Sequence, residues 1–377
     1  MNLGIYVHLP FCPYLCPYCD FAKWPMRKSA SSRYLLALDA EIASTPAALA
    51  QTIFFGGGTP NAYDASVIAA LTARLRSRFP APDGAVSDVS IEVNPELVKA
   101  GDMTTFAEAG IRRVSIGVQS FDADEITTLG RKHNPAQVRA AIESARAAGI
   151  ASISIDLMFA VPGQTLASWR ASLEAAMALG VDHISTYGLT IEEHTPYALW
   201  QGREPKVFFD DVREAEFYAL AIETLETAGF EHYEISNFAK PGHYSRHNAN
   251  YWANGEYIGL GVGAASYRGG VRSVHTRELE EYIEAVLLGS PIPGEAEQLA
   301  GLKQAGEAIM LSLRTARGVD LGAFRKRYGI DILEQYAAVI AEYSAAGLLE
   351  RTERFLFLTK RGRFVANDVC GAFLSFE

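Results

Sequence analysis

The alternation of short β-rich runs with helical patterns between residues 2 and 190 constrains the fold more than any other feature of the chain. Six runs rich in β-branched and aromatic residues are separated by segments whose apolar residues recur at helical spacing. Such alternation is typical of parallel strands joined by crossover helices. We therefore predict an α/β fold in which six units form a barrel-like sheet that is left partly open. The predicted strands are 4–8, 53–56, 89–93, 113–117, 152–156 and 183–187, and the predicted helices are 34–42, 66–79, 137–148 and 168–179.

The rest of the 377 residues predicts a second, smaller unit, because single hydrophobic cores rarely grow beyond about 250 to 300 residues. Residues 190–290 form an elaborated region that is rich in aromatic residues and glycine. After it come three short helical patterns and a β-like pair, which together indicate a winged-helix-like unit. We predict a barrel with its extension over residues 1–290 and an α+β C-terminal domain over 291–377. The predicted C-terminal elements are helices 304–313, 321–328 and 332–345, strands 348–351 and 355–359, and a last helix from residue 360.

The overall charge argues against nucleic acid as a partner, even though winged helices often bind it. The chain carries 44 acidic and 34 basic residues, a net charge of −10, which repels phosphate backbones. The N-terminal sequence has no basic region followed by a long apolar run, and no stretch is long and apolar enough to cross a bilayer. We expect a soluble, cytoplasmic protein.

Three of the four cysteines, Cys12, Cys16 and Cys19, are crowded into a C-x3-C-x2-C run directly after the first predicted strand. Such crowding in a reducing compartment indicates metal binding and not a disulfide framework. A [4Fe–4S] cluster held by three local cysteines leaves one iron open for a small molecule, such as S-adenosylmethionine (SAM). The alternative is a structural zinc ion with His8 as its fourth ligand. The position of the run after a strand, with a glycine run further on, favours the cluster.

Polar residues and glycines gather where the predicted strands end, which is where α/β folds place their chemistry. The glycine run 56–60 follows the second strand, and its missing side chains leave backbone amides open to a ligand. Glu92 could accept from an amine or a ribose hydroxyl, Gln119 and Asp156 could pair with ribose or adenine, and Arg131 could neutralise a carboxylate. Each residue alone could be a solvated residue or a strand-end cap. Together they predict one pocket.

Five segments, 6–12, 56–60, 91–95, 115–121 and 155–157, resemble the radical SAM family of oxygen-independent coproporphyrinogen III oxidases and their relatives. The resemblance covers most of the chain. It implies a radical SAM partial (β/α)6 TIM-like barrel and a [4Fe–4S] cluster on Cys12, Cys16 and Cys19. The SAM contacts that it implies are Tyr6, Tyr18, Gly57, Gly58, Thr59, Glu92, Gln119, Arg131 and Asp156.

The chain departs from the oxidases at Phe21, where they carry a further cysteine. It has instead an H-N-x-x-Y pattern, from His247 to Tyr251, followed by Trp252. This pattern resembles the signature of the HemW-type heme chaperones, and implies that His247 and Tyr251 bind heme for delivery to client hemoproteins. Imidazole is a common axial ligand of heme iron. The alternative for His247 is a polar loop in which it only donates and accepts hydrogen bonds.

Two functions therefore follow from the resemblance. The first is a heme-binding chaperone that carries a SAM-chelating cluster. The alternative is an oxygen-independent coproporphyrinogen III oxidase, which would decarboxylate its substrate to protoporphyrinogen IX by radical chemistry. Whether the chain is an enzyme, whether it forms a homodimer and whether it contacts the cytoplasmic face of a membrane stay open at this point.

Overall fold

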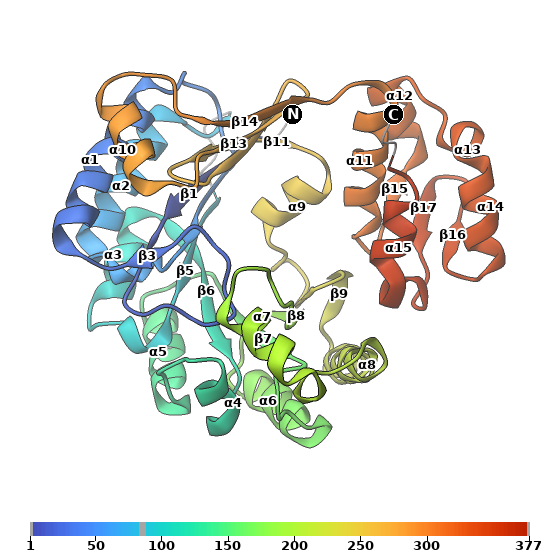
Figure 1. Ribbon diagram of the computed structural model, residues 1–377, viewed down its shortest axis with the longest axis horizontal. Coiled ribbons are helices and arrows are strands. Elements are labelled where there is room, and N and C mark those ends of the chain that lie inside the picture. The colour runs from blue at the N-terminus through green and yellow to red at the C-terminus, as the bar shows by residue number, and fades with distance from the viewer. Residues whose placement is uncertain (1–2, 83–87, 375–377) are drawn as a thin grey trace.

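The computed structural model describes residues 3–82 and 88–374, and its centre is a sheet of twelve strands (Figure 1). The six predicted strands are all present and lie side by side in chain order, each parallel to the next. This confirms the predicted α/β class and the partial barrel. The six strands are β1 (Leu3–Leu9), β4 (Thr52–Gly57), β5 (Asp88–Val93), β6 (Ile111–Gln119), β7 (Ser152–Phe159) and β8 (His183–Gly188).

Both edges of the barrel are extended by strands from the region 231–298. β11 (Glu256–Leu260) pairs parallel with β1, and three antiparallel strands continue outward from it. On the other edge, β10 pairs antiparallel with β8, and β9 pairs antiparallel with β10 as the outermost strand. These added strands are β12 (Ala265–Arg268), β13 (Val271–His275), β14 (Gly294–Gln298), β9 (Glu231–Glu234) and β10 (Asn237–Ala239).

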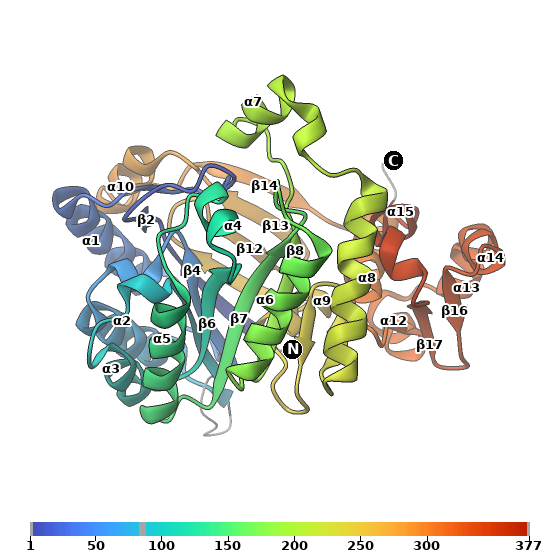
Figure 2. The ribbon, with the colours of Figure 1, turned by 90° about the horizontal axis from the view of Figure 1, so that it is seen from below.

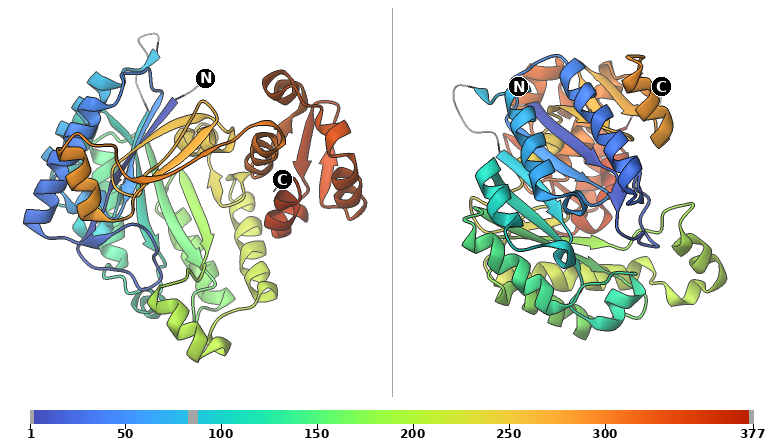
Figure 3. Two further views of the ribbon diagram at one scale, coloured as in Figure 1. Left: turned by 45° about the horizontal axis from the view of Figure 1, so that its top comes forward. Right: turned by 90° about the vertical axis from the view of Figure 1, so that its left-hand side faces the viewer.

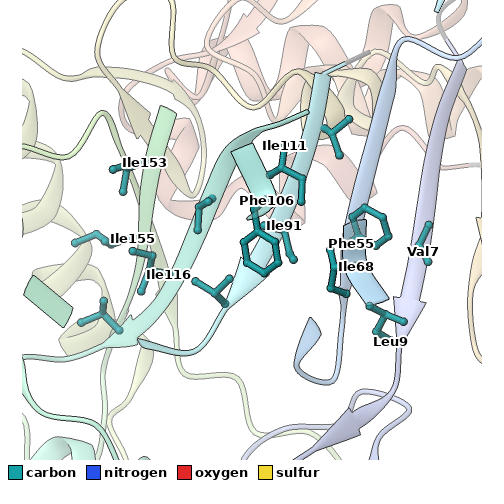
Figure 4. Close-up of a cluster of buried hydrophobic side chains, with 14 of the residues drawn as sticks. Val7, Leu9, Phe55, Ile68, Ile91, Phe106, Ile111, Ile116, Ile153 and Ile155 are labelled. Carbon is teal, nitrogen blue, oxygen red and sulfur yellow. The ribbon is translucent and has the colours of Figure 1, made fainter. Parts of the chain in front are cut away.

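Side chains alternate along each strand between the hydrophobic core and the face that carries the polar residues of the predicted site. Side chains such as Val7, Phe55 and Ile91 are buried, and Figure 4 shows them packed in a row with those of the neighbouring strands. Successive residues of a strand point to opposite faces. Residues next to the core positions, such as Glu92 and Asp156, therefore face the inside of the curved sheet.

Helices cover the outer face of the sheet, and the four predicted ones are among them (Figures 2 and 3). α5 begins at a capping box between Asn134 and Gln137, with Pro135 in its first turn. The helix over 102–109 was not predicted, because only Met103 and Phe106 are buried in it and two positions do not make a helical stripe. These helices include α1 (Lys28–Ser44), α2 (Ala65–Arg78), α3 (Asp102–Ala109), α5 (Pro135–Ala147) and α6 (Leu166–Ala178).

Four further helices belong to the elaborated region. α7 (Pro196–Arg203) projects from the body of the molecule, and α8 (Asp211–Thr227) runs along the barrel beside the C-terminal unit (Figure 2). α9 (Arg246–Trp252) lies between the large sheet and the C-terminal unit, as Figure 1 shows. α10 (Leu279–Leu287) packs on α1. Among the described helices, none combines the length and the apolar character that a membrane crossing needs.

The C-terminal unit has its own hydrophobic cluster, from Ala305 to Phe373, and stands beside the barrel (Figure 3, left). Helices with a small antiparallel sheet of three strands make it α+β and winged-helix-like. The predicted helix 332–345 is two helices, because Tyr336 between them leaves helical geometry at φ −112°. Its elements are α11 (Gly301–Leu313), β15 (Val319–Asp320), α12 (Leu321–Tyr328), α13 (Ile332–Gln335), α14 (Ala337–Ala345), β16 (Leu349–Arg351), β17 (Phe355–Leu358) and α15 (Ala366–Gly371).

The predicted boundary between residues 290 and 291 stays a prediction. β14 belongs to the stretch after it and pairs with β13 of the large sheet, whereas the second hydrophobic cluster begins at Ala305. The outermost residues of the two predicted units, 1–2 and 375–377, lie outside the described residues.

Candidate cluster and SAM site

A cavity of about 400 Å³ opens at the carboxyl edge of the six parallel strands, and it brings together most of the predicted site. The loop that carries the cysteines is held at both ends, because β2 (Phe11–Cys12) pairs with β3 (Trp24–Pro25). The predicted residues that line the cavity are Cys12, Cys16, Cys19, Tyr18, Gly57, Gly58, Thr59, Glu92, Gln119, Arg131 and Asp156.

The three cysteines form a donor set that calls for positive charge. Burial, together with the nearby Cys19 and Cys16, raises the pKa of the Cys12 thiol to about 11. Burial also raises the pKa of Cys19. Thiolates in such a place need a cation to stay ionised, and the irons of a cluster supply one. The residues therefore fit a [4Fe–4S] cluster.

His8 gives no support to the zinc alternative. Its Nδ1 lies 2.9 Å from the Tyr6 hydroxyl and its Nε2 lies 2.7 Å from the carbonyl oxygen of Ala22. Both ring nitrogens are thus already used. Across residues 3–82 and 88–374, no three His, Cys, Asp or Glu side chains surround one point closely enough for a single metal ion.

Packing requires two glycines of the glycine run, in addition to any need for a ligand to reach the backbone amides. A side chain at Gly57, where φ is +109°, would lie 2.6 Å from Nδ1 of His8, and one at Gly58 would lie 2.6 Å from the Pro10 carbonyl. Only glycine fits both positions. The close approach of the strands thus explains these two glycines before any ligand is considered.

Two acidic side chains face the cavity without a full counter-charge. Burial and the charge of Asp156 together raise the pKa of Glu92 to about 8, against the effect of a hydrogen bond from the Gly57 backbone. Burial also raises the pKa of Asp156, against hydrogen bonds from Ser185 and Ser115. A cationic group placed between the two acids would favour their ionised forms. The ammonium and sulfonium groups of SAM are cations of this kind.

Arg131 and Gln119 line the same cavity. Arg131 donates from Nη2 to the Asn94 side chain at 2.8 Å and to the Gly117 carbonyl at 2.6 Å, while Nη1 lies 3.8 Å from the Cys16 sulfur. Its Nε is buried without a hydrogen-bond partner among the described residues. Gln119 has φ +67°, an unusual value for a residue with a side chain, and such strain tends to occur at functional positions.

A second set of residues, which no motif of the sequence indicated, holds the cysteine loop. Tyr14, between the first two cysteines, donates its hydroxyl to Glu96, and the Lys132 ammonium lies 4.9 Å from the centre of the Tyr14 ring. Glu96 also approaches Nδ1 of the buried His133 at 3.8 Å. Lys23 donates to the Cys19 carbonyl. These residues come from separate loops and show no recognisable spacing in the sequence.

Tyr6, His247 and Tyr251 are not in this cavity. Tyr6 and Tyr251 line a neighbouring cavity of about 430 Å³ together with Trp252. His247 is 2% exposed, with Nδ1 at 2.8 Å from the Thr52 hydroxyl and Nε2 at 2.7 Å from the Tyr251 hydroxyl. Burial lowers the pKa of His247 to about 3, so its imidazole is neutral. The predicted heme pair is thus brought together, with both nitrogens of His247 in hydrogen bonds. A contact between Tyr6 and SAM stays a prediction.

Three cysteines at this spacing, on the carboxyl edge of a partial β/α barrel, define the class of radical SAM proteins. The model of the radical SAM superfamily matches residues 6–176, and that of the HemN C-terminal domain matches residues 300–365. Membership of this class implies a [4Fe–4S] cluster and SAM as cofactors.

Relatives that are similar to this chain over its full length identify one family within the class. The heme chaperone HemW of Bacillus subtilis is 35% identical over 373 residues, 98% of each chain. Two further proteins of that name are 36% identical, from Mycobacterium tuberculosis over 97% of this chain and 93% of the relative, and from Escherichia coli over 70% and 69%. The chain belongs to the HemW family.

Among solved structures, coproporphyrinogen III oxidase (HemN) from Escherichia coli matches with a TM-score of 0.86. The match covers 100% of this chain and 91% of the oxidase, at 24% sequence identity. At that level of identity the likeness shows a shared fold and nothing more.

Proposed function

We propose that this protein binds heme and delivers it to client hemoproteins, with a [4Fe–4S] cluster on Cys12, Cys16 and Cys19. The observation that carries the proposal is the similarity to proteins named heme chaperone over 98% of both chains. The position of Phe21 agrees with it. This side chain lines the cysteine cavity and is 63% exposed, where the resemblance to the oxidases calls for a further cysteine.

In the proposed site the cavity residues hold SAM against the cluster, which supplies an open iron and one-electron chemistry in radical SAM proteins. Glu92 accepts from the amine of SAM, and Arg131 pairs with its carboxylate. Asp156 and Gln119 take the ribose and adenine, while Tyr18 and the backbone of residues 57–59 close the pocket. The enclosed position of Glu92 and Asp156 supports this assignment, because two acids that share a cavity attract a cation.

Heme is proposed to bind at α9 through His247 and Tyr251. In the structure these two side chains bond to each other, so ligation of iron by His247 Nε2 requires that it exchange the Tyr251 hydroxyl for the metal. Their i and i+4 positions on one helix would keep the released tyrosine beside the ligand.

The proposal is tested by adding heme and SAM to the anaerobically reconstituted protein and reading the Soret and cluster absorptions together. We expect a heme spectrum that is weakened by His247→Ala, with the cluster absorption retained. Unchanged heme spectra in this variant would remove His247 from the site. A parallel incubation with SAM, a reductant and coproporphyrinogen III tests the oxidase alternative, and accumulation of protoporphyrinogen IX would overturn a function limited to heme transfer.

The remaining assignments belong to the same proposal. We propose a cytoplasmic location and two units over residues 1–290 and 291–377. Homodimer formation and contact with the cytoplasmic membrane face are to be tested by sedimentation with and without heme and by flotation with vesicles.

A further inference from the structure

The guanidinium group of Arg131 lies against one of the predicted cluster ligands. Arg131 lines the cysteine cavity from the loop that follows α4 (Ala123–Thr128), and its Nη1 lies 3.8 Å from the Cys16 sulfur, within hydrogen-bond distance of a sulfur acceptor. No ion pair among residues 3–82 and 88–374 includes Arg131. A guanidinium does not lose its proton in proteins. Its charge therefore has the Cys16 sulfur, and no carboxylate of these residues, at contact distance.

Asn94 and Gly117 hold the other nitrogen of the guanidinium. Nη2 of Arg131 donates to the Asn94 side-chain oxygen at 2.8 Å and to the Gly117 carbonyl at 2.6 Å, so both of its hydrogens are used. A side chain at Gly117 would lie 3.2 Å from this Nη2 and 3.5 Å from the Asn94 oxygen. The glycine at position 117 thus leaves the room that the paired side chains of Arg131 and Asn94 occupy.

Asn61 in turn fixes the backbone of Asn94. The Asn61 side-chain oxygen accepts from the Asn94 N–H and its side-chain nitrogen donates to the Asn94 carbonyl, both at 2.9 Å. Asn61 is 4% exposed and lies in a 3-10 helix, Pro60–Ala62, directly after the glycine run. A side-chain amide can bond both backbone groups of one residue because it carries a donor and an acceptor. Asn94 is therefore held in place beside Arg131.

These contacts join three motifs of the sequence to the cysteine loop. Asn94 belongs to segment 91–95, Gly117 belongs to segment 115–121, and Asn61 follows segment 56–60 directly. Neither asparagine was among the predicted site residues. Asn61 does not line the cysteine cavity, so it acts on the site through Asn94.

A positive charge beside a ligand sulfur changes how readily a cluster accepts an electron. Reduction adds negative charge to the cluster, and a nearby cation stabilises the reduced form more than the oxidised form. Hydrogen bonds to the sulfurs are among the features that set the potentials of iron–sulfur clusters. A guanidinium that is enclosed by protein acts more strongly than one in water, because the effective dielectric constant is lower.

We propose that Arg131 raises the reduction potential of the [4Fe–4S] cluster through Cys16, and that Asn94 and Asn61 are the positioning residues that hold its guanidinium at the sulfur. The inference rests on the cluster of the proposed function, and it adds a second role for Arg131 beside its contact with SAM. The two roles are compatible, because Nη1 carries a second hydrogen that can donate to the carboxylate.

The experiment measures the midpoint potential of the cluster in the absence of SAM. The full-length protein is reconstituted anaerobically and reduced stepwise in the presence of redox mediators, with the reduced cluster followed by electron paramagnetic resonance. The variants are Arg131→Gln, Arg131→Lys, Asn94→Ala and Asn61→Ala. The control is Arg139→Gln, which removes an exposed arginine of α5 that does not line the cavity. Iron and sulfide contents and melting temperatures show whether each variant keeps its cluster and its fold.

We expect Arg131→Gln to lower the midpoint potential by about 59 mV, which is about a tenfold change in the ratio of reduced to oxidised cluster for a one-electron couple. Arg131→Lys should shift the potential less, because lysine keeps the charge but not the planar fork. Asn94→Ala and Asn61→Ala should each change the ratio about threefold in the same direction, since the guanidinium stays but is held less firmly. Arg139→Gln should leave the potential unchanged.

An unchanged potential in Arg131→Gln would overturn the inference, even if SAM bound more weakly to this variant. Arg131→Lys and Asn94→Ala decide the case if Arg131→Gln takes up no cluster, and unchanged potentials in both would overturn the inference as well. A shift in Arg139→Gln as large as that in Arg131→Gln would also overturn it, because any loss of positive charge would then suffice.

Failure of the proposed function gives a different result. If the unaltered protein takes up no iron and sulfide, the cluster assignment is wrong and this inference falls with it. If the unaltered protein holds the cluster but binds no heme, the heme function is wrong, and the potentials of the variants still decide the role of Arg131.

Discussion

The cysteine cavity and the surroundings of His247 both enclose polar side chains. They differ in whether these side chains have hydrogen-bond or ionic partners. In the cavity, burial raises the pKa of both Glu92 and Asp156, and Arg131 has a buried nitrogen without a partner among the described residues. Around His247, every ring nitrogen is bonded and Thr52 and Tyr251 supply the partners. Unpaired polar groups cost free energy in the folded state, while paired ones do not. The comparison indicates a cavity prepared for a charged ligand in the first region, and in the second an imidazole that has to exchange a hydrogen bond before it can bind a ligand.

The largest expected effect concerns the cluster ligands. Cys16→Ala should abolish the charge-transfer absorption of the anaerobically reconstituted protein, because the cluster loses one of three thiolates. The matched control is Cys370→Ala, which removes a buried cysteine of the C-terminal hydrophobic cluster. Retention of the absorption in Cys16→Ala would remove Cys16 from the ligand set.

The unpaired acids predict a pH dependence of stability. The folded-state pKa of Glu92, about 8, lies above its ordinary value of 4.5, so its contribution is complete below pH 4.5 and is lost as the pH rises through 8. We expect the protein without SAM to lose about 3 kcal/mol of unfolding free energy over this range, with allowance for the partly exposed side chain. Urea unfolding at several pH values should show a flatter profile for Glu92→Gln. The same slope in both proteins would contradict a raised pKa at Glu92.

The paired network predicts a loss of stability when its centre is removed. His247→Ala should lower the free energy of unfolding by about 2 kcal/mol, because two buried hydrogen bonds are broken and two hydroxyls lose their partner. Tyr251→Phe breaks one bond and should cost about half as much. Denaturant titration of the protein without heme measures both. Unchanged stability in His247→Ala would mean that the imidazole has no supporting role, which would sharpen its assignment as a heme ligand.

A substitution of Glu92 in the cysteine cavity should lower the affinity for SAM and leave the cluster in place. Glu92→Gln keeps the shape of the side chain and removes the charge that would pair with the amine, so the Kd of SAM should rise about tenfold. Iron and sulfide contents should match those of the unaltered protein. A normal SAM titration would contradict the role of Glu92.

The smallest expected effect tests the residues that hold the cysteine loop. Tyr14→Phe removes only the hydroxyl that donates to Glu96, and should destabilise the loop by about 1 kcal/mol. We expect faster loss of the cluster in air, with the same initial iron content. Tyr343→Phe, on α14 far along the chain, is the control. Equal lifetimes would show that Tyr14 does not support the loop.

Many residues that line the cysteine cavity could be predicted from the sequence, because each belongs to a short motif next to a predicted strand. Cys12, the glycine run, Glu92 and Asp156 each follow or end a strand with a clear hydrophobic pattern, and parallel strands bring their carboxyl ends to one edge. The contacts of Tyr14 with Glu96 and of Tyr6 with the neighbouring cavity had no such signal. They depend on which loops meet in space, and single residues 82 or more positions apart carry no periodicity.

By itself, the sequence determined the strand order, the cysteine loop and the acidic edge of the barrel, since strand periodicity and motif spacing act over short stretches of chain. Only the tertiary structure decided that His247 bonds to Thr52 and Tyr251, and that the Arg314 guanidinium at the end of α11 lies over the Trp252 ring. These contacts join α9 to β4 in one case and to the C-terminal unit in the other. Their physical cause is the packing of segments distant in sequence, which no local pattern records.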